Sequence, residues 1–150
     1  MFDAIVEAAA TESPLWADAT LPAHERLREP VFSRLGPAKH ALGLETIYEG
    51  YLVHYGRSRL FSPADRDTTL LLGDYLYAHG LVHIAATGDV EAVADLADLI
   101  SLCARLRADA LEGDGAAWAE TSSSLGSAAT APPTEAAVDA ALAAHARLVG

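Results

Sequence analysis

The sequence contains one cysteine, Cys103, and one lysine, Lys39, among its 150 residues. A single cysteine excludes an internal disulfide framework and agrees with a reducing, cytoplasmic location. Its neighbours, LISLCARLR, have the pattern of a helix core face, so we interpret Cys103 as a packed and unreactive thiol. Only 10 basic residues oppose 21 acidic ones, for a net charge of −11, so we expect no nucleic-acid partner.

Targeting and membrane signals are also missing. The first residues, MFDAIVEAAATES, contain no basic region of the kind that opens a signal peptide. No uninterrupted apolar run reaches the ~20 residues that cross a bilayer. These absences predict a cytoplasmic protein with no transmembrane segment.

The sequence shows little that is typical of β-structure. It has no alternating apolar pattern, no hairpin signal and no internal repeat, and β-branched residues are few. The chain is instead 51% hydrophobic and rich in alanine, which favours helices. We therefore predict an all-α fold, a bundle of five to six helices.

Residues 63–87 are predicted to form the central helix of this bundle. Asp74 is the only formal charge over most of its length, and apolar residues occur on every side of a helical projection. A helix with this pattern is normally buried inside a bundle. Ser62 is placed to cap its start. Gly73 and Gly80 are seven residues apart and share one face, where another helix can approach closely.

The domain organisation follows from a change in composition. Residues 1–112 are predicted to form the helical bundle, 113–133 a flexible linker rich in Gly, Ser and Ala, and 134–150 a C-terminal helix. Asp89 is expected to cap the helix that precedes the linker, and Thr134 to cap the last helix. Whether the last helix docks on this bundle or on another molecule is left open.

Asp74 is the most conspicuous candidate site residue. A carboxylate in an apolar central helix is costly unless it is hydrogen-bonded, paired or bound to a cation. It is therefore either a ligand or base, or the internal partner of a tyrosine, histidine or arginine on a neighbouring helix. We favour the internal bond, because no second acid lies at helical spacing on the same buried face.

His79 and His83 are four residues apart, which places both imidazoles on one helix face. This spacing suits a divalent metal, but no acid lies between them and a site needs a third protein ligand. We interpret them as interface or core histidines. Glu45 and Glu49 resemble half of a di-carboxylate site, but the matching Glu-x-x-His pairs are absent. We therefore predict no bound metal.

Residues 26–59 reverse the acidic balance, with six bases against three acids. Arg57 and Arg59 are the candidate anion-binding residues of this segment. Its basic side chains either receive a small anion or an acidic partner, or they pair with the chain's own acids. We favour internal pairing, since most surface charge is solvated or paired.

The order of these signals resembles part of the polyprenyl (isoprenyl) diphosphate synthase family, over about residues 40–110. In that family a helix reading like A-x-E-x-I-x-x-x-x-L-V-H-D-D precedes a loop and a helix with L-x-G-D-x-L-x-A. Here Gly43–Gly56 reads GLETIYEGYLVHYG, and Leu71–Ala78 reads LLGDYLYA. The resemblance implies an isoprenoid-synthase-like bundle and a role in isoprenoid biosynthesis.

The chain departs from this family where the family's chemistry takes place. Tyr55, Gly56 and Arg57 replace the start of the first aspartate-rich motif, whose carboxylates hold Mg²⁺ on an allylic diphosphate. The resemblance therefore implies a pseudoenzyme with no catalytic residue and no magnesium cofactor. Because some relatives are heteromers with a degenerate small subunit, it also implies a regulatory or structural subunit. We expect a homodimer or a complex with a larger synthase.

Two aromatic rows are candidate dimer faces, and both are equally compatible with the bundle core. They are Tyr48, Tyr51 and Tyr55, and Tyr75, His79 and His83. The alternative function is an enzyme or binding protein that acts on an isoprenoid diphosphate or another lipid held between helices. In the enzyme form of this alternative, Arg57, Arg59 and either Asp65 or Asp67, all near helix ends, act on the diphosphate.

Overall fold

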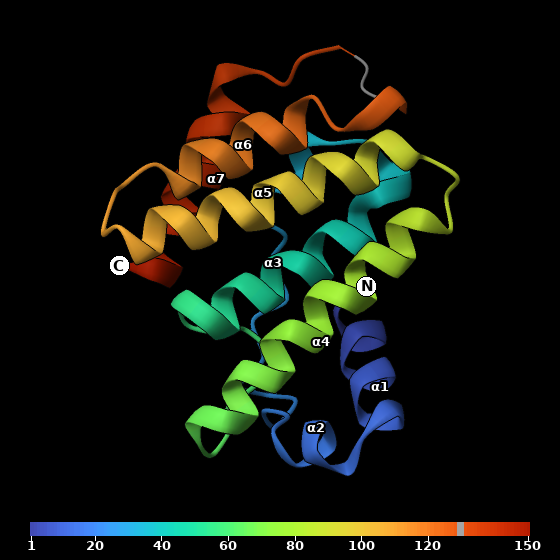
Figure 1. The fold of residues 1–150 in the computed structure, drawn as a ribbon, viewed down its shortest axis with the longest axis vertical. Helices are drawn as coiled ribbons and strands as arrows, with labels where there is room; N and C mark the ends of the chain where they lie inside the picture. Colours follow the sequence, from blue (N-terminus) through green and yellow to red (C-terminus); the bar gives the residue numbers. More distant parts are fainter. Residues whose placement is uncertain (129–130) are drawn as a thin grey trace.

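The computed structural model describes residues 1–128 and 131–150, and within them the chain is helical, without a β-strand. The α-helices are α1 (Phe2–Glu12), α2 (Pro14–Asp18), α3 (Ala41–Tyr55), α4 (Arg66–Ala85), α5 (Val90–Ala108), α6 (Asp114–Ser123) and α7 (Glu135–Val149). Short 3₁₀ helices are η1 (Ser33–Leu35), η2 (Ala38–His40) and η3 (Gly126–Ala128). The predicted all-α class is confirmed (Figure 1). None of these helices is long and apolar enough to cross a membrane.

Helix α3 lies at the centre of the bundle. Every residue from Gly43 to Val53 is buried. Figure 1 shows α3 with α1 and α4 towards one side and α5, α6 and α7 towards the other. Its centre includes two glutamates, so its position depends on partners for their charges.

The prediction of a central helix at 63–87 is wrong in position and in its start. Helix α4 is capped by Asp65 rather than Ser62, because the Asp65 carboxylate accepts a hydrogen bond from a backbone N–H three residues later at 2.7 Å. Only one face of α4 is buried. On the opposite face Leu71 and Val82 are 56% and 63% exposed.

Helices α3 and α4 pack closely through glycines, as predicted for Gly73 and Gly80. A Cβ atom at Gly80 would lie 2.9 Å from the carbonyl oxygen of Gly43, and one at Gly50 would lie 2.9 Å from that of Gly73. These distances leave no room for a methyl group. The glycines of the two helices therefore allow the two backbones to approach one another.

The apolar core has two parts. The larger cluster lies between α3, α5, α6 and α7 and includes Phe32 and Trp118. The smaller lies between α1, α2, α3 and α4 and includes Phe2 and Trp16. Cys103 belongs to the larger cluster, where burial raises the pKa of its thiol to about 12, so the predicted packed thiol is confirmed.

The segment predicted as a linker, 113–133, contains helix α6 instead. Trp118 of α6 is almost fully buried and packs against Phe32, with ring centroids 5.6 Å apart. The aromatic side chain anchors a Gly- and Ser-rich stretch whose composition alone indicated a loop. Residues 129–130 of the predicted linker lie outside the described residues.

The C-terminal helix docks on the bundle. Thr134 caps α7 as predicted, accepting a hydrogen bond from the Ala137 N–H at 3.2 Å. The Tyr48 hydroxyl lies 2.9 Å from His145 Nδ1, which ties α7 to α3. Asp89 caps α5 in the same way, as predicted.

Candidate functional site

A buried ion-pair network connects α3 to the segment that follows it. The Arg59 side chain donates from Nε to Glu49 Oε2 at 2.9 Å and from Nη1 to Glu45 Oε2 at 2.8 Å. All three side chains are almost completely buried. The i, i+4 spacing on α3 places both carboxylates on one face, so one guanidinium reaches both.

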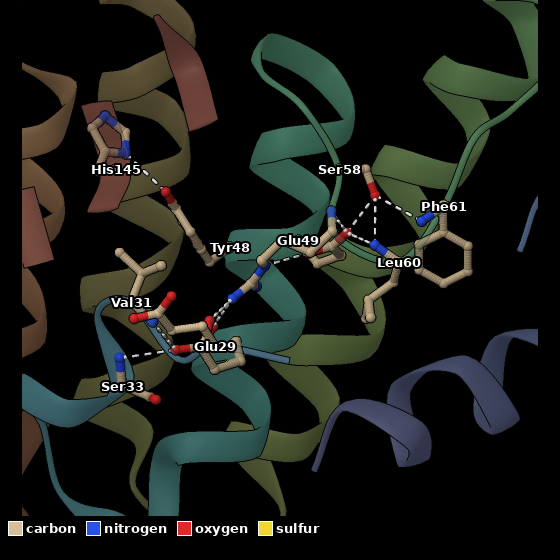
Figure 2. Close-up of polar contacts among 11 residues, drawn as sticks. Glu29, Val31, Ser33, Tyr48, Glu49, Ser58, Leu60, Phe61 and His145 are labelled. Atoms are coloured by element: carbon tan, nitrogen blue, oxygen red, sulfur yellow. Dashed lines mark hydrogen bonds and ion pairs between the residues drawn. The ribbon is translucent and has the colours of Figure 1, made fainter. Parts of the chain in front are cut away.

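Backbone N–H groups complete the coordination of the two carboxylates. Glu45 Oε1 accepts from the N–H groups of Val31 and Ser33 at 3.0 and 3.1 Å. Glu49 Oε1 accepts from the N–H of Leu60 at 3.0 Å and from the Ser58 hydroxyl. Figure 2 shows these donors approaching from two loops on opposite sides of α3. The network therefore holds the loop before α3 and the loop after it against this central helix.

Arg59 is consequently not a freely available anion-binding residue. Burial alone lowers the pKa of its guanidinium, but the adjacent carboxylates of Glu49 and Glu45 raise it above its ordinary value. For Arg59 the favoured interpretation, pairing with the chain's own acids, is confirmed. The two glutamates are likewise engaged by Arg59 and by amides, so they do not form an open carboxylate pair.

Arg57 lies only two residues away in a different environment. Its side chain is exposed, while its backbone N–H donates to the Leu148 carbonyl at 2.8 Å. It lines a cavity of about 230 Å³ between the loop before α3 and helix α7, and Arg59 forms part of the same wall. The structure thus brings both predicted arginines to one cavity, with only Arg57 open to solvent.

Asp74 is exposed, which contradicts its prediction as a buried polar residue. Its side chain is 73% exposed because it lies outside the buried face of α4. Asp74 Oδ1 lies 3.1 Å from Nε2 of His54 on α3, so the favoured type of partner, a histidine on a neighbouring helix, is correct. The pair lines a groove of about 750 Å³ between α3, α4 and α5.

His54 is a site residue that sequence reasoning missed. Its imidazole packs over Gly73, where a Cβ atom would lie 2.6 Å from His54 Cδ2. It also packs against the rings of Tyr55 and Tyr77, at centroid distances of 5.6 and 5.2 Å. The available signal was Gly73 itself, because a glycine facing another helix leaves room for a large partner side chain.

His79 and His83 are partly buried neighbours on α4, as their spacing predicts. Their Nε2 atoms are 3.2 Å apart, and His79 stacks on Tyr75. Burial and the neighbouring His79 lower the pKa of His83. Among residues 1–128 and 131–150, no group of three or more His, Cys, Asp or Glu side chains is arranged to hold a metal ion.

The first aromatic row belongs to the core. Tyr48 and Tyr51 are fully buried and Tyr55 is half-buried, so the dimer-face interpretation of this row is wrong. The two buried rings contact Trp118 with centroids 5.0 and 5.7 Å away. Sequence periodicity could not separate core from interface, because the covering helix α6 lay in the predicted linker.

A second polar cluster was also missed for this reason. Asp114 of α6 accepts hydrogen bonds from the Tyr51 hydroxyl and, at 2.8 Å, from Arg107 Nε. Burial raises the pKa of Asp114, but the hydrogen bonds from Tyr51 and Arg107 outweigh it and lower the pKa below its ordinary value. His145 Nε2 lies 3.9 Å from the same carboxyl group. The cluster joins α3, α5, α6 and α7.

No family model, curated protein or solved structure matches this chain. The resemblance to polyprenyl diphosphate synthases therefore stays a prediction. The geometry of the site carries the functional argument that follows.

Proposed function

We propose that this protein is a non-catalytic helical subunit that dimerises through the outer face of α4. The observation behind the proposal is the exposed apolar stripe on that face. Its exposed members are Leu71, Ala78, Val82 and Ala85, and the half-buried Tyr75 completes an alternating spacing of four and three residues. Such spacing forms a continuous seam along a helix, and the two alanines let a partner helix approach closely.

The state of the acidic residues supports the non-catalytic part of the proposal. Glu45 and Glu49 are occupied by Arg59 and backbone N–H groups, and Asp74 pairs with His54. The resemblance to polyprenyl diphosphate synthases points in the same direction, because its metal-binding carboxylates have no counterpart at 55–57. We expect no prenyl transfer when the protein is incubated with Mg²⁺, an allylic diphosphate and isopentenyl diphosphate. Product formation above a no-enzyme control would contradict this part.

Light scattering of the full chain tests the dimer. We expect twice the mass of one chain, and the mass of a single chain when both Leu71 and Val82 are replaced by Glu. Charges at a buried seam oppose association, whereas both positions are exposed in the monomer. Val90→Glu combined with Leu111→Glu is the matched control, because Val90 and Leu111 are 78% and 57% exposed and lie outside the stripe.

A wild-type protein that remains monomeric at high micromolar concentration contradicts self-association. The larger-synthase form of the proposal then has its own test: a purified polyprenyl synthase should shift the wild-type mass but not that of the Leu71→Glu, Val82→Glu variant. If the synthase shifts the mass of neither the wild type nor the variant, the subunit role is contradicted.

A second candidate function is binding of an apolar ligand in the groove between α3, α4 and α5. The specific observation is its size, about 750 Å³, with Leu70, Tyr77 and Ile100 in its walls. Ala104 is an exposed lining residue, so Ala104→Trp fills the groove without disturbing the core. We expect farnesol to raise the melting temperature of the wild type but not of this variant. An equal rise in both proteins would refute binding in the groove.

A further inference from the structure

The cavity beside Arg57 concentrates positive charge in an acidic protein. Four of the ten basic residues of the chain line it, although the whole molecule has a net charge of −11. They are Arg28, Arg57, Arg59 and Arg147. Three segments distant in sequence supply them: the loop before α3, the loop after α3, and the last turn of α7. The fold, rather than a basic run in the sequence, creates this patch.

The four guanidinium groups differ in whether they already form an ion pair with an acidic side chain. Arg28 pairs with Asp3 at the surface, with 3.0 Å between Nη2 and Oδ1. Among the described residues Arg57 and Arg147 form no ion pair. Arg59 is paired through Nε and Nη1, but its buried Nη2 has no hydrogen-bond partner in the described chain. Within the described chain, the cavity is therefore lined by two exposed, unpaired guanidinium groups and by the buried Arg59, one of whose donors is unsatisfied.

The rest of the cavity lining consists of the exposed Glu29 and four apolar residues. Leu27 and Val31 come from the loop before α3, and Ala144 and Leu148 come from α7. Leu27 is partly exposed at the surface, whereas the other three are buried. At about 230 Å³ the cavity is smaller than the pockets that hold drug-sized ligands. It suits a small molecule with one charged end and a short apolar end.

We propose that this cavity binds a small organic anion, a phosphate monoester or carboxylate that carries a short alkyl chain. Arg57 and Arg147 donate charge-assisted hydrogen bonds to its head group, for which planar guanidinium groups are well matched. The alkyl chain lies against Leu27 and Leu148. This site is separate from the α4 stripe and does not depend on the subunit role.

Calorimetric titration of the full chain with hexyl phosphate tests the site. We expect saturable binding that weakens as salt concentration rises, since the exposed arginines are screened. Inorganic phosphate and hexanol should each bind more weakly than hexyl phosphate, because each lacks one of the two recognised parts. Hexanoate distinguishes the head groups, and tighter binding of either hexanoate or hexyl phosphate identifies the natural class.

Paired substitutions separate the site from general charge effects. Arg57→Gln combined with Arg147→Gln should weaken hexyl phosphate binding about tenfold or more, because both head-group donors lose their charge. Arg66→Gln combined with Arg105→Gln removes the same charge away from the cavity and should leave binding unchanged. Circular dichroism checks that both double variants fold. We expect them to fold because the four substituted arginines are all exposed.

The apolar half of the site has its own variant. Leu27→Ala should weaken binding of hexyl phosphate but not of inorganic phosphate, since it removes only the wall beside the chain. The proposal is overturned if neither hexyl phosphate nor hexanoate shows saturable binding, if the two arginine pairs behave alike, or if hexanol binds as tightly as the better of the two anions. Arg59 is left intact throughout because it holds the buried carboxylates.

Discussion

Helices α3 and α4 are both apolar in sequence, yet they occupy opposite positions in the fold. Helix α3 buries two glutamates at the centre of the bundle, whereas α4 leaves Leu71 and Val82 exposed to solvent. The glutamates are tolerated because Arg59 and four backbone N–H groups satisfy them. The comparison shows that partners for polar groups, as well as hydrophobicity, decide which helix becomes central.

Of the substitutions considered, removing Arg59 should have the largest effect on stability, because it removes the partner that lets α3 bury its glutamates. Arg59→Ala leaves the carboxylates of Glu45 and Glu49 buried without their cation, which costs about 3–5 kcal/mol in the free energy of unfolding. Urea denaturation measures the loss. Arg57→Ala is the control, and an exposed side chain there should change stability by less than about 0.5 kcal/mol. Similar values for both variants would mean that the buried network does not hold α3 in place.

The close contact between α3 and α4 should give the next largest loss of stability. Gly80→Ala puts a methyl group 2.9 Å from the Gly43 carbonyl oxygen, so we expect a loss of up to about 3 kcal/mol. Ala97→Ser on the exposed face of α5 should stay within about 0.5 kcal/mol. Thermal melting distinguishes the two variants. A Gly80→Ala protein as stable as the wild type would show that the helices can separate without cost.

Acidification probes the other side of α3, where Tyr51 and Arg107 bind Asp114. The folded pKa of Asp114 is lowered, so its stabilisation is present at neutral pH and is lost as the pH falls below the ordinary aspartate range of about 4. We expect Asp114→Asn to cost about 1.5 kcal/mol at pH 7. The difference from the wild type should shrink below pH 4. A constant difference across this range would exclude the charge of Asp114 as its source.

The smallest effect is expected where α4 borders the groove between α3, α4 and α5. Asp74→Ala removes a mostly exposed carboxylate that pairs with His54, so stability should change by at most about 1 kcal/mol. Urea denaturation measures the loss in the Asp74→Ala protein, and the loss in the Arg59→Ala protein serves as the reference. If Asp74→Ala lost as much stability as Arg59→Ala, Asp74 would have the structural role in the core that its sequence context indicated.

The sequence predicted those features that depend on local chemistry. The all-α class, the caps at Asp89 and Thr134, and the shared face of Gly73 and Gly80 follow from composition, side-chain caps and helical spacing. The fold resemblance to polyprenyl synthases remains untested. These predictions needed no knowledge of which segments meet in space.

The central helix and the sites depend on distant contacts, and the sequence could not supply them. Arg59 follows α3 in a loop, and nothing in its neighbours shows that its side chain returns to Glu45 and Glu49. The sequence did not reveal helix α6, because Trp118 is the single aromatic residue in a Gly- and Ser-rich segment. Arg57 and Arg147 are 90 positions apart and meet only because α7 docks beside the loop after α3.

The glutamate network also has a consequence for the order of folding. The hydrogen bonds that the Glu45 and Glu49 carboxylates accept join residues only 9 to 14 positions apart, within the segment 31–60. The Tyr48–His145 bond instead spans 97 positions. Because short loops close far faster and at lower entropic cost than long ones, α3 and its two loops should assemble early, with α7 added late. Substitutions at Glu49 should therefore slow refolding, whereas substitutions at His145 should mainly speed unfolding.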